Sequence, residues 1–590
     1  MATPIKRQYA SLAGVDFLNE ESLVNLNRSP DALNVYKDYT AEGSCIQTRP
    51  GYQELAKFDG NINGLSVYND TTALVHSGTN LYLWDNFPSE PENPEVLLST
   101  MNDTVSSFFT FEDKIYINDG LNYLVYDGEL KEVKDNGTIP TTSINRSPMG
   151  GGEQHQDVNV LQPKRINTFV GDGTSTEYYL DTTEITSIDE VYVNDVITTD
   201  YEVSLTLGRV TFNTAPGKPT LGIDNVKIVF SKIVTGYTDR ISKCTISEVF
   251  DNRVFFTGNP SFPNAIFHCK LNDPAYISDV DYYQDGTTES NIKSITVGNN
   301  ILWVFKEPNQ ENATVFYHIP TTSSEYGRIY PSKQGNVSTG CYSTSINFND
   351  DIVFLSKYGL EGITGNIEQE QLLTHRSSLV DNKLINTNNF NNATMCEWRG
   401  YLLILADKYI FLADSRQKFQ GINGIEYEWY FWNIENANPN ILKEYKGNLY
   451  IGAKDGSIFI LRGTNDNGEI INSYWTTPMD AFGYSNMLKT TNKRGGVARI
   501  KTIPNGKIKI AERTNKRDER FITSKSATGF NFASIDFNNF AFTTKNDSYI
   551  VYKIKEKKWL NLSMKFYSDE LDKPFGVYSA VLEAFVGRLC

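Results

Sequence analysis

The sequence lacks the features that mark several large classes of protein. It contains no apolar run of the roughly 18–20 residues that a membrane-spanning helix needs, and its first ten residues, MATPIKRQYA, have no apolar core of the signal-peptide type. Its six cysteines show no CxxC or other close spacing. We therefore expect neither a membrane span, nor a zinc site, nor a disulfide framework, and we expect folding in a reducing cytoplasm.

Catalytic motifs are also missing from the sequence. None of the five histidines lies in an HExxH pattern, and no GxGxxG, GxxxxGK[ST] or GxSxG motif occurs. The stretch TNDNGEI at 464–470 lacks the spaced carboxylates and the closing glutamate of a calcium loop. We predict that the protein is not an enzyme, with no catalytic residues, no metal and no cofactor.

What the sequence does contain is typical of β-strands. It has 34 Tyr and 33 Phe against 7 Met, and long stretches of Ala, Glu, Leu and Lys are absent. Turn-forming Asn, Asp and Gly residues recur between short apolar runs. At 590 residues the chain is too long for one ordinary domain unless that domain is a repeat array. We predict an all-β protein.

A repeat is visible in seven places, where two short strand-like runs flank a polar turn. The turns are anchored at Asp70, Asp113, Asn252, Asn300, Asp351, Gly400 and Gly447. The successive intervals are 43, 139, 48, 51, 49 and 47 residues. Blades of a β-propeller recur every 40–50 residues or so, because one four-stranded blade cannot bury its own faces. We predict a propeller of about six to seven blades; unrelated β-meanders of similar spacing are the alternative.

The one long interval predicts an insertion. Residues 166–232 contain five strand-like runs separated by Gly-Asp-Gly, Asn-Asp, Leu-Gly and Ala-Pro-Gly turns, as in a small β-sandwich. The preceding stretch, with Gly150, Gly151 and Gly152 in a row, is expected to be a mobile linker. The predicted order is an N-terminal hairpin segment over 1–60, first blades over 61–150, the inserted sandwich over 166–232, the remaining blades over 240–463 and a C-terminal β-domain over 464–590.

The N-terminal hairpin is expected in the stretch SPDALNVYKDYTAEGSCIQTRPGYQEL, residues 29–55. A lone hairpin is marginal in water, so this one must pack on a blade or on the C-terminal sheet. Alternation in that sheet, as in Lys507, Ile508, Lys509 and Ile510, predicts one solvated and largely cationic face.

Charge is distributed unevenly along the chain. The net charge is −16, yet residues 465–590 contain 20 Lys or Arg and 13 Asp or Glu, a net of +7, so the preceding 464 residues carry −23. Such segregation suggests that the two parts face different partners, although an ordinary solvated surface is the alternative. The basic residues fall in two clusters, KTTNKRGGVARIK and RTNKRDER. The candidate assembly or DNA-facing residues are Lys489, Lys493, Arg494, Arg499, Lys501, Arg513, Lys516 and Arg517. Contact with DNA phosphates, docking on an acidic protein ring and plain solvation remain open.

The beginning of the chain resembles a known family. The segment GVDFLNEESLVNLNRSPDALNVYKDYTAEGSCIQTRPGY, followed by blades, is similar to tail nozzle and hub proteins of tailed bacteriophages, of the tail tubular protein B and DNA-stabilisation hub types. The similarity lies in Gly14-Val15, Pro30-Asp31, Asn34, Gly43 and Arg49-Pro50-Gly51. The insertion also looks like a β-module of phage tail and fibre proteins, and the ending KPFGVYSAVLEAFVG is similar to the last strands of neck and tail proteins.

The resemblance implies a structural virion protein of the phage tail. It implies a homo-oligomeric ring, a hexamer, that extends the DNA-ejection conduit below the portal and adaptor. The implied partners are adaptor, portal-side and fibre proteins and transiently passing double-stranded DNA. The chain would be made in the host cytoplasm and end in the virion. The alternative is a receptor- or glycan-binding propeller at the tail tip, and a glycan hydrolase is a weaker third hypothesis.

Overall fold

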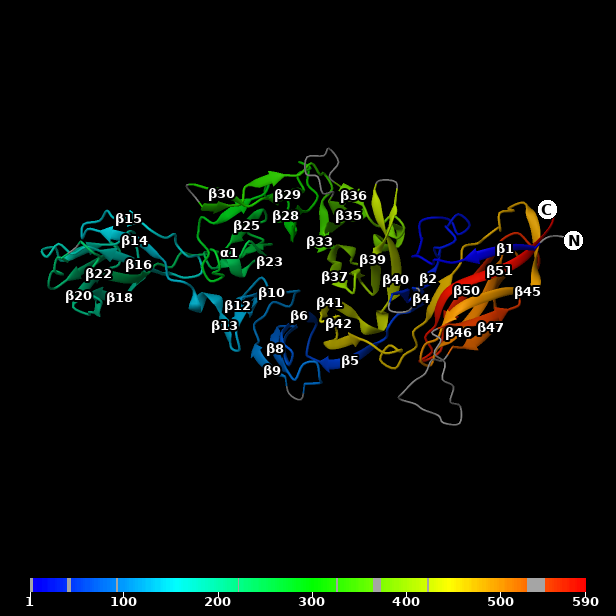
Figure 1. The fold of residues 1–590 in the computed structure, drawn as a ribbon. Helices are drawn as coiled ribbons and strands as arrows, with labels where there is room; N and C mark the ends of the chain where they lie inside the picture. Colours follow the sequence, from blue (N-terminus) through cyan, green and yellow to red (C-terminus); the bar gives the residue numbers. More distant parts are fainter. Residues whose placement is uncertain are drawn as a thin grey trace. The chain divides into compact units, whose positions relative to one another are not determined.

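The computed structural model describes residues 4–39, 44–91, 94–220, 222–324, 327–363, 373–421, 424–527 and 547–589. Strands supply nearly all of its regular structure (Figure 1). The short helices in the described residues are η1 (Val133–Asn136), α1 (Asp239–Ser242), α2 (Asp381–Leu384), η2 (Phe390–Asn392) and η3 (Glu435–Ala437). Two compact units are present, one of Met1–Ser77, Trp84–Pro94 and Thr339–Cys590, the other of Gly78–Leu83 and Glu95–Ser338. The all-β class is confirmed.

Seven four-stranded antiparallel sheets recur along the described residues. Their strands are β6 (Ile62–Asn69), β7 (Thr72–Ser77), β8 (Asn80–Asp85) and β9 (Glu95–Leu98); β10 (Ser107–Phe111), β11 (Lys114–Asn118), β12 (Tyr123–Tyr126) and β13 (Leu130–Glu132); β23 (Ile246–Phe250), β24 (Arg253–Thr257), β25 (Ala265–His268) and β26 (Tyr282–Gln284); β27 (Ile292–Gly298), β28 (Ile301–Lys306), β29 (Val315–His318) and β32 (Ser332–Gln334); β33 (Cys341–Phe348), β34 (Asp351–Ser356), β35 (Gly359–Ile363) and β36 (Leu373–His375); β37 (Thr394–Trp398), β38 (Tyr401–Ala406), β39 (Tyr409–Gln420) and β40 (Ile425–Asn433); and β41 (Pro439–Tyr445), β42 (Asn448–Ala453), β43 (Ser457–Leu461) and β5 (Tyr52–Lys57). A small hairpin, β30 (Thr321–Ser323) and β31 (Gly327–Ile329), is attached between β29 and β32.

Within each unit, the first strand of one sheet packs beside the first strand of the next. In the first unit β33 contacts β37, β37 contacts β41 and β41 contacts β6; in the second unit β10 contacts β23 and β23 contacts β27. The faces between them are apolar, with Leu403 and Ile451 fully buried in the first unit and Phe256 and Val304 in the second. Stacking therefore buries faces that no single sheet could bury alone. The fold is propeller-like, as predicted.

The predicted turn anchors fall at the first hairpin of each of the seven sheets, in the turn or at its edge. Six of these turns have two central residues with positive φ, the backbone of a type I′ turn, which matches the twist of paired strands. The pairs are Glu112 and Asp113, Asp251 and Asn252, Asn299 and Asn300, Asn349 and Asp350, Arg399 and Gly400, and Lys446 and Gly447. Asn, Asp and Gly accept this backbone most readily, which explains why the repeat was visible in the sequence.

The insertion forms two sheets around its own core. Its strands are β14 (Thr141–Arg146), β15 (Glu153–Gln154), β16 (Lys164–Phe169), β17 (Glu177–Tyr179), β18 (Ser187–Val193), β19 (Val196–Ile197), β20 (Tyr201–Ser204), β21 (Arg209–Phe212) and β22 (Val226–Ser231). One sheet has the order β15-β14-β16-β22-β18-β19 and the other β17-β21-β20. Phe169, Tyr178, Val210 and Phe230 are buried between them.

Two expectations about the start of the insertion are corrected. Its sheet begins at Thr141 rather than at Ile166, so β14 belongs to the insertion although it falls within the range predicted for the first blades. The stretch expected to be a linker contains β15, and the positive φ angles of Gly150, Gly151 and Gly152 form the turn that brings β15 back onto β14. Short strands joined by a glycine turn have too few residues to show an alternation in the sequence.

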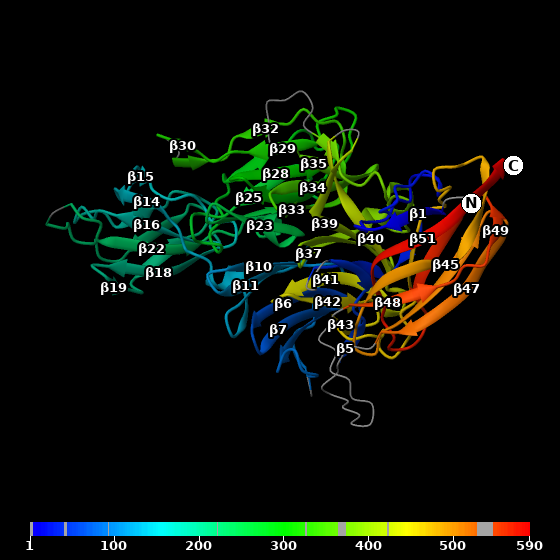
Figure 2. The ribbon, with the colours of Figure 1, turned by 45° about the vertical axis from the view of Figure 1, so that its right-hand side comes forward.

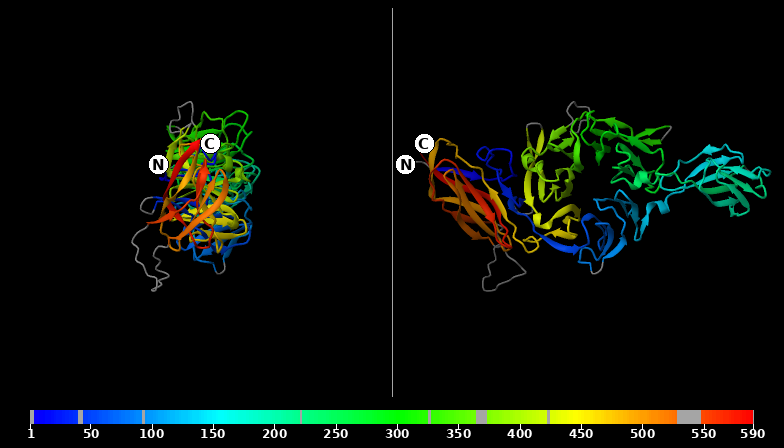
Figure 3. Two further views of the ribbon diagram at one scale, coloured as in Figure 1. Left: turned by 90° about the vertical axis from the view of Figure 1, so that its right-hand side faces the viewer. Right: turned by 180° about the vertical axis from the view of Figure 1, so that it is seen from behind.

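The C-terminal β-domain is built from both ends of the chain. One sheet has the order β3-β4-β51-β45-β48, with β1 on β51 and β49 on β45; the other is β2-β44-β50-β46-β47. Their bounds are β1 (Pro4–Tyr9), β2 (Ala32–Leu33), β3 (Val35–Asp38), β4 (Cys45–Thr48), β44 (Ser473–Thr476), β45 (Met487–Lys501), β46 (Lys507–Thr514), β47 (Arg517–Ser526), β48 (Asp547–Tyr552), β49 (Lys557–Trp559), β50 (Leu562–Ser568) and β51 (Gly576–Leu589). Figure 2 and Figure 3 show the first strand, β1, alongside the last, β51.

The predicted boundaries at 60 and 464 are therefore too simple. Strands β1–β4 complete the two C-terminal sheets, and β5 closes the seventh blade by pairing with β43 from Tyr52 with Leu461 to Lys57 with Ser457. Ile500 and Val577 of one C-terminal sheet share a buried core with Ile510 and Phe566 of the other. Pairing partners about 400 residues or more apart leave no periodic signal, which is why the sequence did not reveal them.

Candidate functional site

The first basic cluster lies along β45, and its described side chains are engaged within the chain. Lys501 donates to the carboxylate of Asp38 and, at 2.7 Å, to the side-chain oxygen of Gln47. Arg499 donates to Asp547 at 2.5 Å, and its guanidinium lies 4.8 Å from the ring centre of Tyr578. These cations tie β45 to its neighbouring strands, and their charge is met by carboxylates of the same domain.

The prediction that Lys489 faces DNA or a partner protein is wrong. Its side chain is fully buried, with 0% exposed. Its ammonium donates to the carbonyl oxygens of Tyr484, Met487 and Leu560 at 2.6, 2.8 and 2.8 Å. Three such bonds satisfy all three ammonium donors, so this lysine cross-links backbone segments in the interior of the domain. The side chains of Lys493 and Arg494, on the same strand, lie outside the described residues.

The second cluster surrounds the turn between β46 and β47. Arg513 pairs with Glu21 of the N-terminal segment. Arg517 pairs with Glu556 at 2.9 Å, while the side chain of Lys516 is exposed. Arg513 and Arg517 are thus paired with carboxylates from different parts of the chain, whereas Lys516 is exposed.

The prediction that the solvated face of the C-terminal sheet is largely cationic is also wrong. Lys507 and Lys509 do point away from the core, but Glu570 accepts from both, at 2.7 and 2.8 Å, and Asp569 accepts from Lys509 at 2.5 Å. The two lysines lower the pKa of Glu570 to about 2. The bonds from Asp569 and Glu570 in turn raise the pKa of Lys509. This face is an ion-pair network rather than a free basic surface.

The residues that carry the family resemblance gather between β40 of the sixth blade and the start of the C-terminal domain. Arg49 is fully buried and donates to both carboxylate oxygens of Asp466, at 2.8 and 2.6 Å. It also donates to the side-chain oxygen of Asn34, which accepts from the Asn433 backbone at 2.8 Å. One arginine thereby holds the hairpin, the blade and the C-terminal domain together.

Two glycines of the same segment are required by close backbone approach. A Cβ at Gly14 would lie 2.5 Å from backbone atoms of Trp429, and one at Gly51 would lie 1.8 Å from the carbonyl oxygen of Asn465. Beside Gly14, the buried pair of Arg28 and Glu428 has a shortest contact of 2.6 Å. Gly43, which also carries the resemblance, lies outside the described residues. We call residues 14–51 the N-terminal joint, because this segment packs tightly against both the sixth blade and the C-terminal domain.

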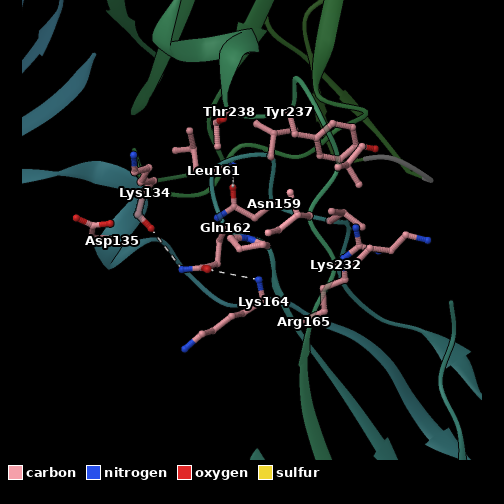
Figure 4. A pocket seen from close by; sticks show the side chains of 15 residues that line it. Lys134, Asp135, Asn159, Leu161, Gln162, Lys164, Arg165, Lys232, Tyr237 and Thr238 are labelled. Atoms are coloured by element: carbon pink, nitrogen blue, oxygen red, sulfur yellow. Dashed lines mark hydrogen bonds between the residues drawn. The ribbon is translucent and has the colours of Figure 1, made fainter. Parts of the chain in front are cut away.

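A cavity of about 470 Å³ in the second unit was not suggested by the sequence. It is lined by Lys134, Asp135, residues 158–165, residues 232–234, Tyr237 and Thr238; we call it the neck cavity, because the chain enters and leaves the insertion there. Figure 4 shows two hydrogen bonds of Gln162 to other lining residues: the amide donates to the Lys134 carbonyl and accepts from the Lys164 backbone. Its lysines and arginine come from segments up to about a hundred residues apart, so no local motif could predict that they line one cavity.

None of the helices in the described residues is both long and apolar enough to cross a membrane. Across the same ranges, no group of three or more His, Cys, Asp and Glu side chains is placed to hold a metal ion.

Comparisons with known proteins add little beyond the fold. No family model and no curated protein matches the chain. Among solved structures, the computationally designed Ika8 protein is 11% identical, with 70% of this chain and 99% of that one covered and a TM-score of 0.32. An exo-β-1,3-galactanase from Phanerochaete chrysosporium is 8% identical, with coverage of 81% and 95% and a TM-score of 0.18. The extracellular domain of the putative hybrid two-component system BT4673 from B. thetaiotaomicron is 10% identical, with coverage of 77% and 51% and a TM-score of 0.21. These likenesses are too weak to bear on function, and the fold rests on the strand pairing of the chain itself.

Proposed function

We propose that the protein is a structural subunit of a bacteriophage tail, a nozzle or hub protein that assembles into a homo-oligomeric ring of six and forms part of the DNA-ejection conduit. The observation that carries this proposal is the N-terminal joint. Gly14, Asn34, Arg49 and Gly51 carry the family resemblance, and the same residues make the buried contacts between blade and C-terminal domain. The resemblance thus concerns residues with a shared structural task rather than scattered identities.

The charge distribution supports a conduit role. The first 464 residues carry a net charge of −23, and an acidic wall repels phosphates, so DNA would pass without binding to it. The described basic candidates are largely paired with carboxylates of the same chain, which leaves few cations to retain DNA. In this proposal the chain is made in the host cytoplasm, has no catalytic role, and meets adaptor, portal-side and fibre proteins in the virion.

Assembly of the purified protein tests the proposal. We expect sedimentation and negative-stain images to show a closed ring, alone or after mixing with a portal–adaptor complex, and we expect short duplex DNA to bind weakly at physiological salt. A chain that stays monomeric at every concentration and does not join the portal–adaptor complex would contradict it. A ring with a basic inner wall would remove the electrostatic part of the proposal only.

Exposed apolar side chains on the insertion favour the alternative, a receptor- or glycan-binding propeller at the tail tip. Val196 and Ile197 on β19 are 67% and 60% exposed. Apolar side chains gathered on a surface are characteristic of binding sites. Binding of the monomer to host cells, lost when β19 is made polar, would support this alternative over the conduit.

A further inference from the structure

The neck cavity contains a buried arginine without a partner. Arg165, on β16, is 8% exposed. Its Nε atom is buried and makes no hydrogen bond, and no ion pair reaches its guanidinium from the described part of the chain. Buried guanidinium groups are nearly always paired, because an unpaired charge in a protein interior loses its hydration without compensation. Of its three nitrogens, Nε alone is both buried and unpaired, so the terminal nitrogens are accessible to an anion that enters the cavity.

Further positive charge surrounds Arg165 in the wall of the neck cavity. Lys164 has no carboxylate partner within the described ranges. Across the same ranges, Lys232 donates to neutral oxygens, those of Thr182 and Thr183 at 2.7 and 2.8 Å. Lys134 is paired with Glu132 outside the cavity, and Asp135 is the single acidic residue in the lining. The lining thus carries an excess of positive charge in a partly enclosed space, where electrostatic attraction is stronger than at an open surface.

Apolar side chains also line the neck cavity and suit an organic ligand. They are Val158, Val160, Leu161, Pro163, Ile233 and Val234, and they share the lining with the neutral polar residues Asn159, Gln162, Tyr237 and Thr238. The volume of about 470 Å³ falls within the range of small-molecule sites, which combine a mostly apolar lining with a few fixed polar groups. Gln162 is held in the lining by its hydrogen bonds to Lys134 and Lys164 (Figure 4).

We propose that the neck cavity binds a small organic oxyanion, with its carboxylate or phosphate group paired to Arg165 and its body against the apolar part of the lining. Guanidinium groups match both anions with two parallel hydrogen bonds, so the geometry alone leaves the two head groups open. This site goes beyond the structural role proposed above and does not depend on it.

Titration of the full-length protein tests the site. Calorimetry with glucose 1-phosphate and with glucuronate separates the two head groups, inorganic phosphate tests the head group alone, and glucose is the uncharged control. We expect saturable binding of at least one organic oxyanion and none of glucose. We expect Arg165→Gln to weaken binding about tenfold or more, because it removes a charge-assisted hydrogen bond. We expect Lys164→Gln to weaken binding to a smaller, measurable extent, because it removes a positive charge from the lining. Lys218→Gln is the matched control, since this exposed lysine lies in the same unit outside the cavity.

Two readouts keep the test decisive if Arg165→Gln alters folding. Lys164 is only partly buried, so its variant should keep the thermal unfolding midpoint of the natural protein and lose affinity alone. Addition of the bound oxyanion should raise the midpoint of the natural protein and not that of Arg165→Gln. The proposal is overturned if no oxyanion binds, if binding of Lys164→Gln equals that of Lys218→Gln, or if an oligoglutamate peptide binds more tightly than every small anion.

Discussion

At the scale of single residues, buried ion pairs fix the N-terminal segment. Arg49 is 0% and Asp466 8% exposed, so each depends on the other for its charge. We expect Arg49→Met to lower the free energy of unfolding of the first unit by about 3–5 kcal/mol, because it leaves the Asp466 carboxylate buried and unpaired. Urea unfolding followed by tryptophan fluorescence measures the change.

A surface pair provides the control for Arg49. Lys57 and Asp455 lie 3.6 Å apart and are 60% and 50% exposed. Lys57→Met removes the same type of charge pair in water, where its contribution is below about 1 kcal/mol. Adding Asp466→Leu to Arg49→Met should recover part of the lost stability. If Arg49→Met and Lys57→Met lowered the free energy of unfolding by the same amount, the buried pair would stabilise the fold no more than an exposed pair does.

A second residue-scale prediction concerns His375, which lies between two carboxylates. Its Nε2 is 2.6 Å from Asp381 and its Nδ1 is 3.1 Å from Glu361. Burial by itself lowers the pKa of His375, but the hydrogen bonds with Asp381 and Glu361 outweigh it and raise the pKa to about 10. The folded state therefore holds a proton that the unfolded chain releases near pH 6.5, roughly its unperturbed value.

This proton makes stability depend on pH in a defined direction. Because the folded pKa is raised, the stabilisation is fully present below about pH 6.5 and is lost as the pH rises through about 10. We expect the unfolding midpoint to fall across that window, and we expect His375→Gln to flatten the fall while costing on the order of 2 kcal/mol at pH 6. Thermal melts from pH 6 to 10 measure this, with the exposed His155→Gln as control. Parallel pH profiles for all three proteins would refute the role of His375.

At the scale of elements, the hairpin turns specify the sheets. Asn299 and Asn300 join β27 to β28 with φ angles of 54° and 59°. Glycine adopts this backbone without strain, whereas a β-branched side chain is disfavoured by about 1–2 kcal/mol. We expect Asn300→Val to destabilise the second unit by about that amount and Asn300→Gly to leave it nearly unchanged, as measured by urea unfolding. If both variants lost the same stability, the side chain of Asn300 rather than its backbone would be responsible.

The same turns explain how much of the fold the sequence could predict. Local signals suffice for a two-residue turn such as Asn299 and Asn300, so the blades and most strands of the insertion were found. Strands β1, β2, β4 and β5 pair with strands about 400 residues or more further along the chain, and no local pattern encodes that choice. The basic candidates were recognised by residue type alone, whereas partners such as Asp38 for Lys501 come from distant strands. The neck cavity could not be predicted for the same reason, because its lining residues come from segments that are distant in the sequence.

At the scale of the whole molecule, the chain leaves the propeller-like sheets of the second unit in two excursions, 142–155 and 165–230, rather than one. Thr141 and Gln156 are joined by a backbone hydrogen bond of 3.0 Å, and Lys164 pairs with Ser231 across β16 and β22. Between these excursions the chain returns to the propeller, where Val160 and Leu161 are buried in the core of the second and third sheets. The segment 157–163 therefore belongs to the propeller although the sequence places it within the linker.

Selective removal of the two excursions tests this division. We expect a variant in which 142–155 and 165–230 are each replaced by an Asn-Gly turn to remain soluble, because paired strand ends are close enough for a two-residue turn and the core keeps Val160 and Leu161. Replacing 142–230 as one block should instead destabilise the second unit by about 4 kcal/mol or more, since two buried aliphatic side chains are lost. Hydrogen exchange of β10 and β23 distinguishes the outcomes: protection should persist in the first variant and fall in the second. Equal protection in both would place 157–163 outside the propeller core.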